Sequence, residues 1–259
     1  MATPASLRAF EMWTTRYKRM WRSGLTSSLL SPLLFLTAMG VGLGSLVNRG
    51  PGAAAFNGVR YVSFIAPGLL AAAAIQIAAA ESMWPVLGSI KWDRTYHAML
   101  ATPLGVADVL LGHLMYMAMR VFLSAVSFGM VMALFGTIHS WWAPLAIPAA
   151  TLGGAAIATS FAAFAATRDL DSSFAALSRF VIIPMFLFSG TFYPISRLPS
   201  LVRPIAYITP LYHSVALCRS FTLGTVTGAG VIAHAGFLAA VTLVAWRVGI
   251  VTFRRRLAV

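Results

Sequence analysis

The sequence predicts an all-α integral membrane protein with six transmembrane helices. Hydrophobic residues make up 59% of its 259 residues and charged residues only 10%, and the mean hydropathy is +0.82. An ordinary soluble domain needs more charged side chains than this to cover its surface. Short segments with basic residues separate long apolar runs, which is the pattern of a protein that crosses the membrane several times.

Six stretches are apolar and long enough to be spans, because a helix needs roughly 20 mainly apolar residues to cross a bilayer. They occupy residues 25–47, 61–84, 106–135, 142–167, 174–191 and 230–252. Small residues in the first and fourth stretches, among them Gly40, Gly153 and Gly154, favour close helix packing. The even number of spans places both termini on the same side of the membrane.

The basic residues predict which side that is. Eleven lie on the side of the termini: Arg8, Arg16, Lys18, Arg19, Arg22, Lys91, Arg94, Arg168, Arg254, Arg255 and Arg256. Five lie on the opposite side: Arg49, Arg60, Arg197, Arg203 and Arg219. Because cytoplasmic loops carry the excess of Lys and Arg, we expect both termini in the cytoplasm. The net charge of +13 thus reflects topology, and no nucleic-acid partner is predicted.

Residues 1–24 predict an amphipathic helix at the membrane surface. Its large apolar side chains recur at three- and four-residue spacings, at Phe10, Trp13, Tyr17, Met20 and Trp21. Charged residues occupy the other sectors of the same helix. A basic anchor on the cytoplasmic leaflet and a helix that lies beside a partner protein both fit this pattern.

The segment 88–104, between the second and third spans, predicts a short cytoplasmic helix. Tyr96, Met99 and Leu100 lie at helical spacing, and Thr102-Pro103 precedes the third span. Apolar and aromatic side chains on such a helix can fit a groove of another protein. The alternative is an ordinary loop with a proline before the next helix.

Residues 190–226 interrupt the apolar pattern before the last span. The helix breakers of this segment are Gly190, Pro194, Pro199, Pro204 and Pro210. A proline removes a backbone donor and crowds the preceding turn, and irregular backbone at membrane depth survives only where protein or a cavity surrounds it. We expect two short helical pieces within 190–210 that enter and leave the outer leaflet.

Ionisable residues inside the apolar stretches need a partner or water. Glu81 lies near a cytoplasmic end and is expected to extend toward water. Arg120 lies well inside the third stretch. Because Asp108 and His113 also make the beginning of this stretch polar, a helix that begins below the membrane is favoured over an arginine that faces an inner cavity. For Arg179 in the fifth stretch, Asp169 or Asp171 is the expected partner.

Catalytic motifs are absent from the sequence. It contains no G-x-x-x-x-G-K-[ST] phosphate loop, no H-E-x-x-H motif and no G-x-S-x-G motif. The five histidines have no ligand spacing, and the single cysteine, Cys218, excludes an intrachain disulfide. No enzyme activity, catalytic residue, metal or cofactor is predicted for this chain. A transport subunit fits better than an ion-coupled secondary transporter, which needs a buried carboxylate relay, or a membrane enzyme, which needs a polar cluster.

The motifs FSGTFYPISRLP and ITPLYHSVALCRSFTLG, with Thr-Pro at 102–103, resemble ABC-2 type exporter permeases, particularly the branch of nodulation J-type and daunorubicin-resistance permeases. The resemblance covers nearly the whole chain. It implies the ABC-2 exporter fold, with a connecting helix at 1–24, a six-helix transmembrane domain at 25–259, a coupling helix at about 88–104 and a re-entrant extracellular segment at about 190–226. The implied function is the export of an amphipathic drug-like compound, lipid or lipid-linked glycan across a bacterial cytoplasmic membrane.

The resemblance also implies partners and functional residues. Two separate ATPase subunits, which would bind ATP and Mg, a second copy of this permease or a similar one, and membrane lipid are the implied partners. The residues implied to contact an ATPase subunit are Arg94, Thr95, Met99, Leu100, Thr102 and Pro103. Those implied for the extracellular re-entrant gate are Gly190, Phe192, Tyr193, Pro194, Leu198, Pro199 and Pro210. The candidates for the substrate path, between the first and fifth spans of two subunits, are Met39, Phe180, Met185, Phe186 and Phe188.

Overall fold

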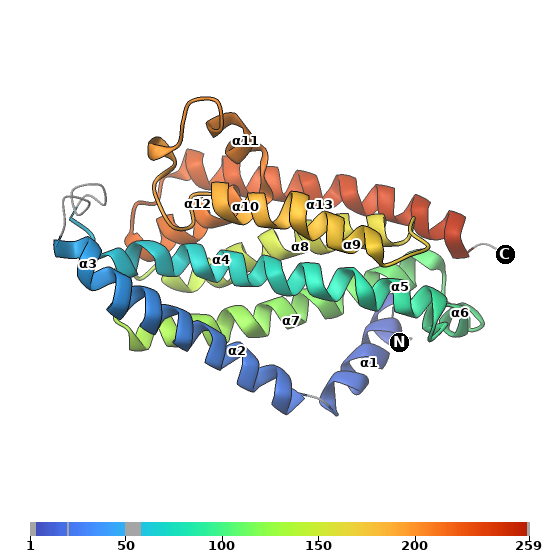
Figure 1. Cartoon of the computed structure of the whole chain (residues 1–259). Helices are drawn as coiled ribbons and strands as arrows, with labels where there is room; N and C mark the ends of the chain where they lie inside the picture. Colours follow the sequence, from blue (N-terminus) through green and yellow to red (C-terminus); the bar gives the residue numbers. More distant parts are fainter. Residues whose placement is uncertain (1–3, 20, 50–57, 258–259) are drawn as a thin grey trace.

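The computed structural model shows a bundle of helices and describes residues 4–19, 21–49 and 58–257 (Figure 1). No strand occurs in these ranges. The first half consists of α1 (Ala5–Lys18), α2 (Trp21–Leu36), the π-helical η1 (Thr37–Leu43), α3 (Gly44–Arg49), α4 (Tyr61–Ser82), α5 (Trp84–Lys91), α6 (Thr95–Leu100) and α7 (Val106–Leu134). The second half consists of η3 (Ala143–Leu145), α8 (Ala146–Ala165), α9 (Ser172–Leu177), the π-helical η4 (Ser178–Ile182), α10 (Ile183–Phe188), η5 (Ile195–Arg197), α11 (Arg203–Ile208), α12 (Pro210–Leu223) and α13 (Gly228–Leu257). The all-helical prediction is therefore confirmed.

Five helices of the described part are long and apolar enough to cross a membrane: Leu29–Arg49, Tyr61–Lys91, Val106–Leu134, Ala143–Ala165 and Gly228–Leu257. They match five of the six predicted spans. The remaining one, predicted at 174–191, is the shorter apolar helix Ser172–Phe188. It ends where Gly190 adopts a φ of 79°, in the left-handed region that suits glycine. The helix thus lies two to three residues before the predicted 174–191, and its length is at the lower limit of the roughly 17–25 residues that can form a span.

Small residues build the centre of the bundle around α4 and α8. Ala71 and Ala78 of α4 and Ala150 and Ala162 of α8 are fully buried. Gly154 of α8 lies so close to α7 that an added Cβ would be 2.8 Å from a methyl of Val121. The predicted close packing of the fourth span is therefore confirmed, and a larger side chain there would force the helices apart.

The two ends of the bundle differ in their elements (Figure 1). One end carries α1, α5, α6 and the C-terminal end of α13, while α3 lies at the opposite end. Between α10 and α12 the chain leaves the bundle as a loop that carries η5 and α11. The cytoplasmic and extracellular segments expected from the sequence thus belong to opposite ends of the bundle.

Candidate functional site

Helix α1 packs against α7 along a contact that requires a glycine. An added Cβ at Gly112 of α7 would lie 2.5 Å from Cβ of Ala9 and 2.8 Å from the backbone nitrogen of Phe10. Both Ala9 and Trp13 of α1 are buried. The helix predicted at the membrane surface therefore also packs against α7 of the same chain. Among its expected apolar residues, Met20 and the side chain of Trp21 lie outside the described residues.

Four aromatic residues from four helices meet beneath α1 and are here called the aromatic cluster: Trp13 of α1, Tyr96 of α6, His113 of α7 and Phe253 of α13. The rings of Trp13 and His113 stack at 3.9 Å between centroids, with planes 5° apart. The Tyr96 hydroxyl lies 2.5 Å from Nδ1 of His113, and its ring centroid lies 5.6 Å from that of Phe253. Burial raises the pKa of the Tyr96 phenol, so it stays neutral. Packed aromatic rings of this kind join the four helices into one rigid unit.

The residues predicted to contact another protein through α6 are only partly accessible. Tyr96 is fully buried and Met99 is 6% exposed, while Thr95 and Leu100 are half-buried. The apolar face of α6 that was expected to fit a partner's groove therefore packs into the bundle of this chain. Helical spacing identifies an apolar face but not the surface that covers it. The remaining residues of the set, Arg94, Thr102 and Pro103, are exposed.

An exposed tryptophan between α5 and α6 was missed by the sequence reasoning. Trp92 is 63% exposed and follows the last residue of α5. Arg94, the N-cap of α6, has a φ of 49°, which turns the chain sharply at this point. The carboxylate of Asp93 lies 3.9 Å from the guanidinium of Arg16 in α1. The available signal was a tryptophan within a polar turn, a residue that is enriched at protein interfaces.

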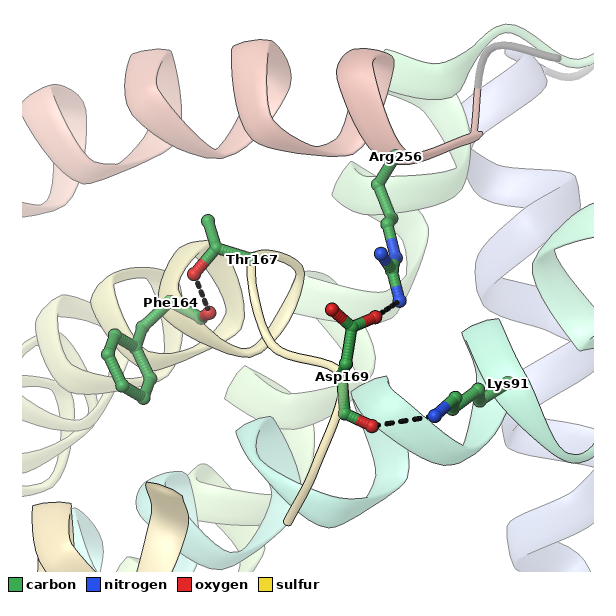
Figure 2. A network of polar contacts seen from close by, with 5 residues as sticks. All are labelled: Lys91, Phe164, Thr167, Asp169 and Arg256. Atoms are coloured by element: carbon green, nitrogen blue, oxygen red, sulfur yellow. Dashed lines mark hydrogen bonds and ion pairs between the residues drawn. The ribbon is translucent and has the colours of Figure 1, made fainter. Parts of the chain in front are cut away.

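Asp169, in the connection between α8 and α9, ties three segments together (Figure 2). Its carboxylate accepts a hydrogen bond of 2.6 Å from Arg256 of α13, and its backbone oxygen accepts one of 2.7 Å from Nζ of Lys91 in α5. The hydrogen bond from Arg256 holds the pKa of the Asp169 carboxyl below its usual value. Among the described residues Arg179 forms no ion pair with Asp169 or Asp171, so both predicted pairings are wrong. The partner of Asp169 is Arg256 of α13.

A pocket of about 550 Å³ opens beside the aromatic cluster, and Trp13, Glu81, Trp92 and Arg120 contribute to its lining. Nη1 of Arg120 lies 3.2 Å from Oε1 of Glu81, and its guanidinium lies 5.0 Å from the ring centroid of Tyr17. Arg120 thus faces a cavity, and Glu81 pairs with it instead of extending toward water. Helix α7 runs without a break from Val106 through Arg120, and Glu81 of α4 supplies the counter-charge. The start of this helix below the membrane stays a prediction.

The opposite end of the bundle is organised by Arg219 of α12. Its Nη2 donates to the backbone oxygen of Gly190 at 2.9 Å, and its Nε donates to that of Phe64 in α4 at 3.3 Å. The guanidinium also lies 3.8 Å from the centroid of the Phe64 ring. Such carbonyl contacts fix the turn after α10 against α4. The sequence identified Arg219 only as one charge among five, because its partners are backbone atoms.

The residues of the predicted gate lie along this turn and the loop that follows. The Tyr193 hydroxyl donates to the backbone oxygen of Leu187 at 2.7 Å, and Phe192 packs edge-on against Phe186 at 5.2 Å. Leu198 is buried. Proline positions mark the element boundaries: Pro194 caps η5, Pro199 is exposed in the connection to α11, and Pro210 begins α12. Two short helical elements lie within 190–210, the three-residue η5 and the six-residue α11. Their expected entry into the outer leaflet stays a prediction.

The candidates for a substrate path do not share one face. Phe180 is 78% exposed, whereas Met185 is 4% exposed and faces the bundle. Phe186, Phe188 and Met39 are half-buried. Met39 lies in η1, where its oxygen accepts a hydrogen bond from the amide of Gly44 five residues later. Both the first apolar helix and Ser172–Phe188 thus contain a π-helical segment, a feature often found at functional sites.

A profile of the family described as ABC-2 type transporter matches residues 9–223 of this chain. The chain belongs to the ABC-2 type transporter family. Nodulation protein J of Rhizobium leguminosarum bv. viciae is 32% identical over 250 residues, which cover 95% of this chain and 93% of the relative. Its counterpart in Rhizobium leguminosarum bv. trifolii is 31% identical, with coverages of 97% and 95%. The inner membrane transport permease YadH of Escherichia coli strain K12 is 26% identical, with coverages of 89% for both chains.

As an ABC-2 permease, the chain is a membrane subunit of an ABC transporter, is not itself catalytic, and belongs to a family that associates with ABC ATP-binding subunits. Within the described ranges, no group of three or more His, Cys, Asp or Glu side chains could hold a metal ion. The aromatic cluster and Asp169 connect α5 and α6 to α1, α7 and α13.

Proposed function

We propose that this permease exports an amphipathic compound, whether a drug-like molecule, a lipid or a lipid-linked glycan, out of the cytoplasm. The family match over residues 9–223 carries the proposal. In the proposed complex, two ATP-binding subunits, each with ATP and Mg, act on a pair of permeases formed by two copies of this chain or by this chain and a similar one. Both termini lie in the cytoplasm, as the distribution of eleven and five basic residues favours.

The proposed contact with an ATP-binding subunit is the exposed surface of the α5–α6 turn and of the end of α6. It consists of Trp92, Arg94, Thr102 and Pro103, all of which are exposed. A tryptophan of this kind supplies the large apolar area typical of an interface anchor, and an arginine beside it supplies hydrogen bonds. Met99 and Leu100 act from inside, where they support the turn. Their buried and half-buried positions favour this role over direct contact.

Movement of that turn would reach the membrane through the aromatic cluster. Tyr96 of α6 contacts α7 through His113 and α13 through Phe253. Since packed cores are not continuously deformable, a push on α6 shifts these helices as bodies. Closure of the ATP-binding subunits would thereby open a path between the helices Leu29–Arg49 and Ser172–Phe188 of two permeases. The loop from Gly190 to Pro210 would close that path from outside.

Reconstitution with the cognate ATP-binding subunit tests the proposal. In inverted membrane vesicles the ATP-binding face is outside, so export appears as ATP-dependent uptake into the lumen. We expect uptake of daunorubicin or of a fluorescently labelled phosphatidylethanolamine, and no uptake with an ATP-binding subunit whose phosphate-loop lysine is replaced. If the ATP-binding subunit co-purifies with the permease but no amphipathic probe is taken up in an ATP-dependent manner, export is contradicted. If the ATP-binding subunit does not co-purify, the partner assignment is contradicted.

A further inference from the structure

A second pocket, of about 690 Å³, lies at the end of the bundle where α4 begins and α12 ends. This volume falls within the range of about 300–1,000 Å³ that is typical of small-molecule sites. Its polar lining comes from segments that are distant in sequence: Arg60, His139, Ser196, Arg219 and Thr225. Apolar atoms of Val59, Phe64 and Leu223 complete it. The pocket is separate from the one that holds Glu81 and Arg120.

The lining carries positive charge and no acidic side chain. The six acidic residues of the chain are Glu11, Glu81, Asp93, Asp108, Asp169 and Asp171. None of them lines this pocket, and residues 50–57, which precede it in the sequence, contain no Asp or Glu. The ion pairs of the described residues involve Arg16, Arg120 and Arg256. Arg60 and Arg219 therefore face the pocket without a carboxylate from this chain.

Arg219 is held in place but keeps donors available. Nε donates to the backbone oxygen of Phe64, and Nη2 donates to those of Gly190 and Thr191. Of the five N–H groups of a guanidinium, the two on Nη1 have no hydrogen-bond partner among the described residues. The side chain is only partly buried and contributes to the pocket wall. The carbonyl contacts thus fix a cation whose remaining donors are left for a ligand.

We propose that this pocket binds a phosphate group, with Arg219 and Arg60 as its principal ligands. Guanidinium groups match phosphate oxygens in charge and geometry. A phosphate presents more acceptor oxygens than a carboxylate, and the lining offers several donors for them: two guanidinium groups and the hydroxyls of Ser196 and Thr225. The phosphate belongs to a soluble anion or to a phospholipid headgroup. The proposal does not depend on the direction of transport.

The test uses permease purified in dodecyl maltoside, because this detergent contains no phosphate that could occupy the pocket. One arm measures binding of inorganic phosphate by its effect on the melting temperature, against chloride at equal ionic strength. The other arm measures retention of phosphatidylglycerol by native mass spectrometry, against an uncharged diacylglycerol. We expect the wild-type protein to bind one of the two probes. Arg60→Gln should weaken that binding about tenfold, because it removes a charge-assisted contact from an exposed position.

Arg197→Gln is the matched control, because Arg197 is an exposed arginine of η5 that does not line the pocket. Binding of inorganic phosphate identifies a soluble anion, and retention of phosphatidylglycerol alone identifies a headgroup. Absence of both overturns the proposal. An equal loss in Arg60→Gln and Arg197→Gln overturns it too, since the effect would then be one of overall charge. Arg219→Lys tests the second proposed phosphate ligand in the same two assays. If Arg219→Lys does not fold, the comparison of Arg60→Gln with Arg197→Gln still decides the proposal.

Discussion

The Tyr96 hydroxyl lies 2.5 Å from Nδ1 of His113, in the interior of the bundle. This contact joins α6, which leads from the exposed α5–α6 turn, to α7, which crosses the molecule. Nε2 of His113 and the indole nitrogen of Trp13 are buried and have no hydrogen-bond partner among the described residues. The Tyr96 hydroxyl is thus the hydrogen-bond partner that the structure gives to the imidazole.

Tyr96→Phe should destabilise the permease by about 1–3 kcal/mol, because it leaves a second buried nitrogen of His113 without a partner while it keeps the ring packing. The melting temperature in detergent measures the change. Tyr207→Phe is the matched control, since Tyr207 is 48% exposed and should change stability little. Equal stability of Tyr96→Phe and the wild type would show that the hydrogen bond contributes nothing to the fold.

Trp92→Ala should weaken binding of the ATP-binding subunit at least about tenfold, because truncation of an interface tryptophan commonly costs more than 1 kcal/mol. Its melting temperature should stay close to that of the wild type, since the side chain is 63% exposed. Titration of the ATP-binding subunit against immobilised permease measures the affinity. Trp141→Ala is the control, because Trp141 is 83% exposed but lies outside the proposed contact surface. Unchanged affinity of Trp92→Ala would remove Trp92 from the interface.

The sequence predicted much of the bundle, because long apolar runs and the break at Gly190 are local signals. The prediction failed where a pattern shows that one face of a helix is apolar but does not show whether this chain or a partner protein buries that face. Tyr96 and Met99 have the spacing of a helix that docks on a partner, yet Tyr96 packs against α7 and α13 of this same chain.

Pairs of residues that are distant in the sequence could not be predicted either. Asp169 meets Arg256 across 87 positions of the sequence, and Arg219 meets Phe64 across 155. No local pattern encodes such pairs.

Glu81→Gln should destabilise the protein by about 1–3 kcal/mol, because it leaves the partly buried Arg120 facing its pocket without a counter-charge. The double variant Glu81→Gln/Arg120→Gln should recover much of this loss, since neither unpaired charge remains. Thermal melting of the four proteins forms a double-mutant cycle. Glu11→Gln, which removes an exposed carboxylate of α1, serves as the control. Additive effects of the two substitutions would show that Glu81 and Arg120 do not stabilise each other.

The pair of Asp169 with Arg256 should make the end of α13 sensitive to acid. Because the pair lowers the pKa of Asp169 in the folded protein, its contribution is present above the ordinary pKa of about 3.9 and is lost as the pH falls through the lower, folded value. At neutral pH, Asp169→Asn should speed amide hydrogen exchange in residues 254–257. The difference from the wild type should shrink below about pH 4. Asp171→Asn, at an exposed position two residues away, should have no such effect. A difference that persists undiminished in acid would argue against the ion pair as its cause.

Cysteines placed in the loop that carries η5 and α11 should report the proposed orientation. Ser196 and Ser200 are exposed, so Ser196→Cys and Ser200→Cys should react with a membrane-impermeant thiol reagent added to intact cells. Cys218 is fully buried and is replaced by alanine to remove any background. Ala98→Cys, at an exposed position of α6, is the matched control and should react only after the membrane is permeabilised. The reverse pattern would overturn both the cytoplasmic placement of the termini and the gate.

If the loop closes the path from outside, labelling of Ser196→Cys should also change during ATP turnover in the assembled complex, whereas a static loop would label at one constant rate.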